Sequence, residues 1–440
     1  PAQINVPRDY WTQVVDIELP PIVRLEGQAG GADAIEQAAK ILSDAKFPVI
    51  LSGAGVVIGG AIEDCVKLAE KLDSPVCSGY QHNDSFPGSH PLAVGPLGYN
   101  GSKAAMELIA KADVVLALGT RLNPFSTLPG YGIDYWPKNA KIIQVDMNPD
   151  RIGLTKKVTV GICGDAKLVA KQLLNKLSPK AGDTDRQKRK DLIHQTKSAW
   201  LQKLSSLDHE DDDPGTVWNK EARERDKDRM SPRQAWRAIQ AGMPEDVIIS
   251  SDIGNNCAIG NAYPTFEKGR KYLAPGLFGP CGYGFPSILG AKIGCPETPV
   301  IGFAGDGAFG ISMNEMSSCA RKEWPAISMV IFRNYQWGAE KRNTTLWFDN
   351  NFIGTELDPE LSYAKVANAC GLKGVTVKTM EETTKAIKQS CEDQKKGITT
   401  FIEVILNQEL GEPFRRDAMK KPVKVAGIKK EDMKPQKSLN

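Results

Sequence analysis

Several features are absent or scarce in the 440-residue sequence, and each absence excludes a class of protein. No apolar run approaches the roughly 18–20 residues that a membrane-spanning helix needs, and the N-terminus lacks the basic-then-apolar pattern of a secretory signal. The nine cysteines form no C-x-x-C pair, which argues against a zinc ribbon or a disulfide scaffold and makes a reducing cytoplasm the simplest compartment. Lysine plus arginine (56) nearly balances aspartate plus glutamate (53), so the net charge of +3 predicts no nucleic-acid binding.

Histidine is scarce as well. The four histidines are His82, His90, His194 and His209, so proton transfer in the C-terminal part of the chain has no local histidine to use. The remaining composition is that of an ordinary globular protein, with 41% hydrophobic and 25% charged residues. The length predicts two or three domains.

Helical and strand patterns alternate in two separate blocks, which predicts an α/β fold with two doubly wound parallel sheets. The first block, residues 20–180, is a central domain, and the second, residues 231–410, is a C-terminal domain. Residues 181–230 between them are densely charged and are expected to form a surface linker with partly helical stretches. Residues 411–440 are a basic tail.

The individual elements follow from hydrophobic periodicity and from the turn residues that bound them. The expected helices are 34–43, 61–72, 106–111, 233–241, 312–321 and one that ends near 291. The expected strands are 48–52, 75–77, 113–118, 141–145, 247–251, 299–304, 326–332 and 400–406, the last of which closes the second sheet.

The segment that is richest in chemistry lies between two of these strands. One strand ends at Gly305-Asp306-Gly307, and the next ends just before Asn334. A right-handed crossover makes such strands parallel, so both ends meet at the carboxyl edge, where open α/β sheets bind ligands. A carboxylate and an amide oxygen there suit Mg²⁺ bridging to a diphosphate, with backbone N–H groups of Gly307 and Ala308 on the phosphates.

This strand–GDG–helix–strand–Asn arrangement resembles the diphosphate-binding motif of thiamine diphosphate enzymes. The resemblance implies thiamine diphosphate and Mg²⁺ as cofactors, with Asp306, Asn334 and the backbone carbonyl of Gln336 as metal ligands. The family usually has two adjacent Asn, whereas this chain has Arg333-Asn334, so only the second position is matched.

Two further regions resemble the acetolactate-synthase-like branch of these enzymes. The loop 277–284 resembles the one that supports the bent cofactor, which implies that the Gly279 carbonyl accepts from the cofactor and that Cys281 stands where the family has a bulky apolar residue. The block at 20–180 resembles the middle domain, in which some relatives hold FAD, although nothing in this sequence requires it.

More specific stretches narrow the resemblance to the sulfoacetaldehyde acetyltransferase family. These stretches are residues 4–11, 79–90, 121–136, 334–343 and 413–424. The resemblance implies cleavage of sulfoacetaldehyde by phosphate to give sulfite and acetyl phosphate. Two alternatives stay open, namely an acetolactate-synthase-like carboligase or decarboxylase of 2-oxo acids, and a non-catalytic subunit that binds the cofactor.

Both substrate and acceptor would be anions, so the site is expected to contain cations. The candidates are Arg121, Lys341 and Arg342, each of which is as easily read as a solvated surface charge. Asn255 follows a strand end and is a further candidate for substrate contact, with a turn role as the alternative.

Two residues are candidates for proton transfer. Glu340 follows Asn334 closely enough to face the reacting carbon, although a carboxylate at a helix start has a structural explanation as well. His82 is the histidine that could reach the site from the central domain, and a loop histidine held by the backbone is the alternative.

Enzymes of this kind also need a glutamate from an N-terminal pyrimidine-binding domain, supplied across a dimer interface. The resemblance implies a homodimer or homotetramer. Residues 1–15 resemble only the last strand and exit of that domain, with the strand at 2–6 lacking a nearby partner. We therefore expect the 440-residue chain to be inactive until that domain is supplied.

Overall fold

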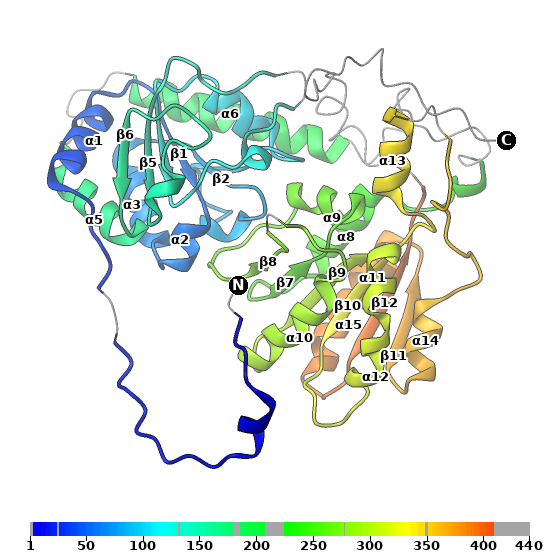
Figure 1. Cartoon of the computed structure of the whole chain (residues 1–440). Helices are drawn as coiled ribbons and strands as arrows, with labels where there is room; N and C mark the ends of the chain where they lie inside the picture. The colour runs from blue at the N-terminus through cyan, green and yellow to red at the C-terminus, as the bar shows by residue number, and fades with distance from the viewer. Residues whose placement is uncertain are drawn as a thin grey trace.

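The computed structural model describes residues 3–23, 26–130, 133–178, 185–206, 224–276, 278–347 and 351–408. They form two α/β domains, each built on a six-stranded sheet whose strand pairs are all parallel. Figure 1 shows the central domain in blue to teal and the C-terminal domain in green to orange. The expected doubly wound α/β fold class is confirmed.

The central sheet has the strand order β3-β2-β1-β4-β5-β6. Its strands are β1 (Pro48–Ser52), β2 (Val76–Ser78), β3 (Ala93–Pro96), β4 (Val114–Leu118), β5 (Lys141–Asp146) and β6 (Val160–Cys163). Its helices are α1 (Ala32–Asp44), α2 (Ala54–Ile58), α3 (Ile62–Leu72), α4 (Lys103–Ile109) and α5 (Ala166–Lys176). Every residue of β1 and β4 is buried, as expected for parallel strands covered by helices on both faces.

The C-terminal sheet has the strand order β11-β12-β10-β9-β7-β8. Its strands are β7 (Ile248–Ser251), β8 (Tyr272–Leu273), β9 (Val300–Gly305), β10 (Ser328–Arg333), β11 (Lys373–Val377) and β12 (Thr400–Ile405). Its helices are α8 (Pro232–Gly242), α9 (Asn255–Ile259), α10 (Gly284–Gly294), α11 (Asp306–Ser312), α12 (Met316–Cys319), α13 (Gly338–Trp347), α14 (Tyr363–Ala369) and α15 (Met380–Gln394). Short 3₁₀ helices also occur before and within both domains. They are η1 (Arg8–Thr12), η2 (Asn83–Ser85), η3 (Pro124–Thr127), η4 (Pro149–Arg151), η6 (Gly260–Ala262) and η7 (Met313–Glu315).

Alternate strand residues of the C-terminal sheet enter two separate cores. Phe303 and Phe332 pack with Trp236 of α8 on one face, whereas Ala304 and Ile331 pack with residues of α10, α11 and α14 on the other. This division follows the two-residue period of a strand. Local sequence signals fix the helix starts, since Ser231 and Gln234 form a capping box at α8 with Pro232 in its first turn.

Several expectations about individual elements were wrong. Described residues 3–6 do not form the strand expected at 2–6, because no neighbouring strand supplies partners for their backbone groups. The helix expected at 312–321 instead begins at Asp306 as α11 and continues through η7 and α12. The strand β12 lies inside the sheet and not at its edge, because β11 pairs along its outer side.

The charged region between the domains is more than a surface linker. It contains the 21-residue helix α6 (Arg186–Ser206). Ile193 of this helix joins the core of the central domain, while Trp200 and Leu204 join a core of the C-terminal domain. Among the described residues, no helix is both long and apolar enough to span a membrane.

Buried polar contacts also join the two domains. The Asn83 side-chain amide donates to the carbonyl oxygens of Asn261 (2.9 Å) and Pro264 (2.8 Å). Asp84, 2% exposed, accepts from the backbone N–H groups of Lys271 (2.9 Å) and Tyr272 (3.2 Å). The loop after β2 therefore holds the edge of the C-terminal sheet through hydrogen bonds that water does not replace.

Replacing Asn83 by alanine leaves two interdomain carbonyl oxygens without their donor. We expect the free energy of unfolding to fall by about 1–3 kcal/mol, the usual cost of an unsatisfied buried polar group. Urea denaturation measures the change, and Asn139→Ala, at an exposed turn position, is the matched control. An equal loss in both variants would contradict the role given to Asn83.

Candidate active site

Asp306 occupies the centre of the carboxyl edge of the C-terminal sheet. Phe332 of β10 is registered opposite Gly305 of β9, so Arg333 and Asn334 lie beside the GDG segment as the crossover predicts. Asp306 is 1% exposed. Its Oδ1 accepts from the Gly307 N–H (2.9 Å), and its Oδ2 accepts from the Tyr335 N–H (2.7 Å) and from Arg333 Nη1 (3.1 Å).

Burial raises the pKa of Asp306 to about 6, and the Arg333 guanidinium beside it opposes that rise. Asp306 therefore remains largely ionised at neutral pH despite its burial. A buried carboxylate that keeps its charge is a natural ligand for a divalent cation.

The surrounding groups fit a metal ion and a diphosphate. The Asn334 side chain is 2% exposed and has no hydrogen-bond partner among the described residues, and no backbone N–H of those residues donates to the Gln336 carbonyl. A Cβ atom at Gly305 would meet no protein atom within 4 Å, so the space there is open. Oxygens without partners beside open space are what a bound cation and its phosphates require.

The N-terminus of α11 also differs from the expectation in one respect. The Gly307 N–H already donates to Asp306, so the Ala308 N–H is the donor left for a phosphate oxygen. The reason for glycine at 307 is also different: a Cβ there would lie 2.8 Å from the Trp337 ring.

The loop 278–284 is held by one buried carboxylate, Asp252, directly after β7. Asp252 accepts from the backbone N–H groups of Ile253 (2.8 Å), Gly282 (3.0 Å) and Gly284 (2.6 Å). Gly279 and Gly282 have φ values of +63° and +85°, which favour glycine. Leu277 lies outside the described residues, and the sequence patterns did not single out Asp252.

Cys281 is exposed in this loop. Part of the residue is still shielded from water, and this partial burial raises the pKa of its thiol. The negative charges of Asp252 and Glu340 raise the pKa further. The structure thus brings Glu340, near the start of α13, into the neighbourhood of the loop.

The candidate cations have different surroundings. Lys341 forms an ion pair with Glu356, and its ammonium lies 5.1 Å from the centre of the Phe352 ring, so its charge is already balanced. Arg342 belongs to α13, but its side chain lies outside the described residues. Asn255 is the first residue of α9, close to Asp252 in the chain, and is 5% exposed.

His82 and Arg121 lie together in the central domain. Both line a cavity of about 500 Å³ at the carboxyl edge of the central sheet, with Arg151 and Asp146. Burial and the Arg121 charge lower the pKa of His82 to about 4, so its imidazole is neutral at neutral pH. None of the described contacts joins His82 or Arg121 to Asp306 or Asn334.

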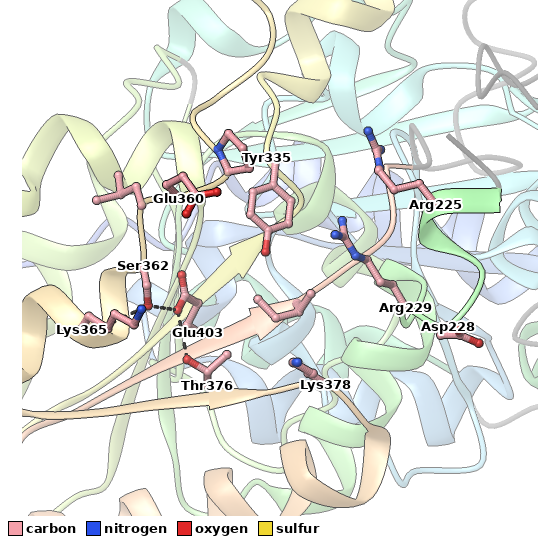
Figure 2. Close-up of a pocket in the computed structure, with 13 residues that line it drawn as sticks. Arg225, Asp228, Arg229, Tyr335, Glu360, Ser362, Lys365, Thr376, Lys378 and Glu403 are labelled. Atoms are coloured by element: carbon pink, nitrogen blue, oxygen red, sulfur yellow. Dashed lines mark hydrogen bonds between the residues drawn. The ribbon is translucent and has the colours of Figure 1, made fainter. Parts of the chain in front are cut away.

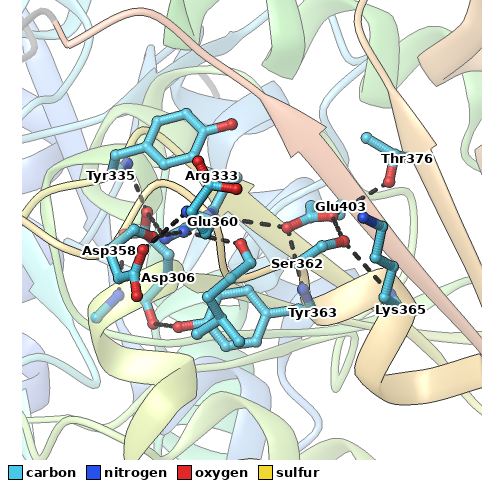
Figure 3. Close-up of polar contacts among 12 residues, drawn as sticks. Asp306, Arg333, Tyr335, Asp358, Glu360, Ser362, Tyr363, Lys365, Thr376 and Glu403 are labelled. Carbon is cyan, nitrogen blue, oxygen red and sulfur yellow. Dashed lines mark hydrogen bonds and ion pairs between the residues drawn. The ribbon is translucent and has the colours of Figure 1, made fainter. Parts of the chain in front are cut away.

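Sequence patterns missed the network behind Asp306, which Figure 3 shows. Arg333 is fully buried between Asp306 and Glu403 of β12, and Tyr363 of α14 donates its hydroxyl to the Asp306 carbonyl (2.9 Å). The available signal was an arginine directly after the apolar run Met329–Phe332 of this strand. A further cavity of about 500 Å³ adjoins this network at Tyr335 and Glu403, and Figure 2 shows that both basic and acidic side chains line it.

Comparisons with known proteins agree with this geometry. Residues 35–173 match the family described as "Thiamine pyrophosphate enzyme, central domain", and residues 252–404 match "Thiamine pyrophosphate enzyme, C-terminal TPP binding domain". Fold and site together therefore define the class of the thiamine pyrophosphate enzymes.

Individual relatives narrow the class. A protein of Rhizobium meliloti named probable sulfoacetaldehyde acetyltransferase is 76% identical over 439 residues, covering 100% of this chain and 74% of that protein. The sulfoacetaldehyde acetyltransferase of Roseovarius nubinhibens is 72% identical, covering 99% and 72%. A probable acetolactate synthase large subunit of Methanococcus aeolicus is 29% identical, covering 89% and 65%. The chain belongs to the sulfoacetaldehyde acetyltransferase family.

The accessibility of Cys281 tests whether its loop supports the cofactor. A raised thiol pKa means that the thiolate fraction, and with it the rate of alkylation by iodoacetamide, falls by about tenfold for each pH unit below that pKa. We expect slow alkylation of Cys281 at pH 7 that accelerates as the pH rises. Added Mg²⁺ and thiamine diphosphate should protect it.

Mass spectrometry follows both reactions, and Cys295, which is also exposed, is the internal control. Equal protection of Cys281 and Cys295, or of neither, would contradict the placement of the cofactor at this loop.

Proposed function

We propose that the protein is an acetyltransferase that uses thiamine diphosphate and Mg²⁺ to cleave sulfoacetaldehyde with phosphate, giving sulfite and acetyl phosphate. The observation that carries the proposal is the buried Asp306–Asn334 pair at the carboxyl edge of the C-terminal sheet, in a chain 76% identical to a named relative. The acetolactate synthase relative is much less similar, at 29% identity.

Asp306, Asn334 and the Gln336 carbonyl would hold Mg²⁺, and the Ala308 N–H would bind a phosphate oxygen of the cofactor. When bound, thiamine diphosphate would supply an electron sink for the aldehyde carbon of the substrate, and sulfite would leave from the adjacent carbon. The loop held by Asp252 would support the cofactor through Gly279, with Cys281 beside it. The metal and phosphate roles of the Asn334 side chain, the Gln336 carbonyl and the Ala308 N–H are supported by the absence of hydrogen-bond partners for these groups among the described residues.

Glu340 is the group that we assign to proton transfer. It lies near Cys281, and the neutral His82 is a weaker candidate because its pKa of about 4 leaves it a poor base at neutral pH. Arg121 and Arg342 remain the candidate cations for sulfonate or phosphate, together with Asn255. Lys341 would have to leave Glu356 to serve the same purpose.

We further propose that the active enzyme is a homo-oligomer with a pyrimidine-binding domain at the site. The two family matches describe a central and a C-terminal domain, and the resemblance implies that a glutamate from a pyrimidine-binding domain completes the site.

The decisive assay measures sulfite released from sulfoacetaldehyde in the presence of Mg²⁺ and thiamine diphosphate, with and without phosphate. We expect the homo-oligomeric enzyme to release phosphate-dependent sulfite and an equal amount of acetyl phosphate. Asp306→Ala is the negative control, because it removes a metal ligand. Cofactor binding without sulfite, combined with turnover of pyruvate, would contradict the substrate and leave the cofactor assignment intact.

Glu340→Gln separates an enzyme from a subunit that only binds the cofactor. The substitution keeps the size of the side chain and removes its proton-transfer capacity, so kcat should fall by about 100-fold or more while cofactor affinity stays unchanged. Titration of bound thiamine diphosphate alongside the rate distinguishes the two effects. An unchanged kcat would remove Glu340 from the mechanism.

A further inference from the structure

Arg333 is a fully buried cation without an evident role in stability. It ends β10 with 0% exposure, and it carries five donors into the core of the domain. Burying an ion pair costs about as much free energy as its attraction returns, so packed apolar residues would stabilise such a position equally well. The presence of arginine here therefore calls for an explanation in the adjacent site.

The two terminal nitrogens of the Arg333 guanidinium are held by hydrogen bonds, whereas Nε has none among the described residues and faces Glu403 (Figure 3). Nη1 donates to Asp306 Oδ2 (3.1 Å), and Nη2 donates to the carbonyl oxygens of Leu361 (2.9 Å) and Asp358. The rings of Tyr335 and Tyr363 lie 4.2 Å and 5.3 Å from its central carbon. A planar fork held in this way can take one orientation, and it imposes that orientation on the Asp306 carboxylate.

Glu403 supplies the charge that balances Arg333. Its Oε1 lies 3.8 Å from Arg333 Nε, and its other oxygen accepts from the hydroxyls of Ser362 (2.6 Å) and Thr376 (3.1 Å). With Glu403 as its counter-charge, Arg333 can orient Asp306 without cancelling the negative charge that a cation needs. The three side chains together carry a net charge of −1, as a lone metal-binding carboxylate would.

We propose that Arg333 is a positioning residue for the metal ligand Asp306, and that Glu403 balances its charge so that Asp306 stays available to the divalent cation. The proposal rests on the proposed function only for the presence of Mg²⁺ and thiamine diphosphate, and not for the substrate. Residues that orient metal ligands in this way typically contribute about 10- to 100-fold to metal affinity.

The test titrates cofactor binding, followed by intrinsic tryptophan fluorescence, in the full chain and its variants. In Arg333→Met, the Mg²⁺ concentration for half-maximal binding at saturating thiamine diphosphate should rise by about 10- to 100-fold. The thiamine diphosphate concentration for half-maximal binding at saturating Mg²⁺ should change by less than threefold. A general structural defect would move both titrations together.

Further variants keep the test decisive if Arg333→Met folds poorly. Arg333→Lys keeps the charge but not the planar fork, so it should recover only part of the Mg²⁺ affinity that Arg333→Met loses. Glu403→Gln keeps the size of Glu403 and should weaken Mg²⁺ binding in the same direction as Arg333→Met. Arg189→Met, at a buried arginine that donates to the Lys46 carbonyl in the central domain, is the matched control.

The outcomes separate this proposal from the proposed function. Normal Mg²⁺ titrations in Arg333→Met and Glu403→Gln, or equal losses in Arg333→Met and Arg189→Met, would overturn the role of Arg333. Absence of sulfite release with these shifts intact would overturn the substrate alone.

Discussion

The buried negative charge of Asp306 is the constraint on which the C-terminal domain is organised. A carboxylate with 1% exposure requires donors, and three structural elements supply them: the start of α11, the backbone after β10 and the side chain of Arg333. These donors come together only because β9 and β10 are parallel and in the register that sets Phe332 opposite Gly305. The topology of the sheet and the charge of one residue therefore depend on each other.

The sequence predicted the features that depend on short spans of the chain. The GDG segment and Asn334 follow adjacent strands, so their meeting at one edge follows from the handedness of a single crossover. Although the capped helices α5, α14 and α15 were missed, the long buried strands and helix α8 were predicted within one or two residues. Their signals are local, because each is carried by a continuous apolar run or by a cap.

The sequence could not predict the features that depend on contacts between residues far apart in the chain. The partner of Arg333, Glu403, lies on β12, and the partner of Lys341 is Glu356 on a segment without periodicity. The edge strands β3, β6, β8 and β11 were missed because two to five residues carry too little pattern to distinguish a strand from a turn. Helix α6 looked like a solvated linker because its few apolar residues serve two different cores.

Acidic residues follow the ends of two neighbouring strands, and their surroundings give them different tasks. Asp252 after β7 accepts three backbone N–H groups, so its capacity is used to shape the loop that carries Cys281. Asp306 after β9 has two backbone donors and one side-chain donor, and that side chain is itself balanced by Glu403. Asp252, whose oxygens accept only from backbone N–H groups, holds the loop in place. Asp306 is oriented by Arg333, whose positive charge is balanced by Glu403, so its negative charge stays available to a ligand. An aspartate thus shapes a loop after one strand, and under the proposed function the aspartate after the neighbouring strand would bind the metal ion.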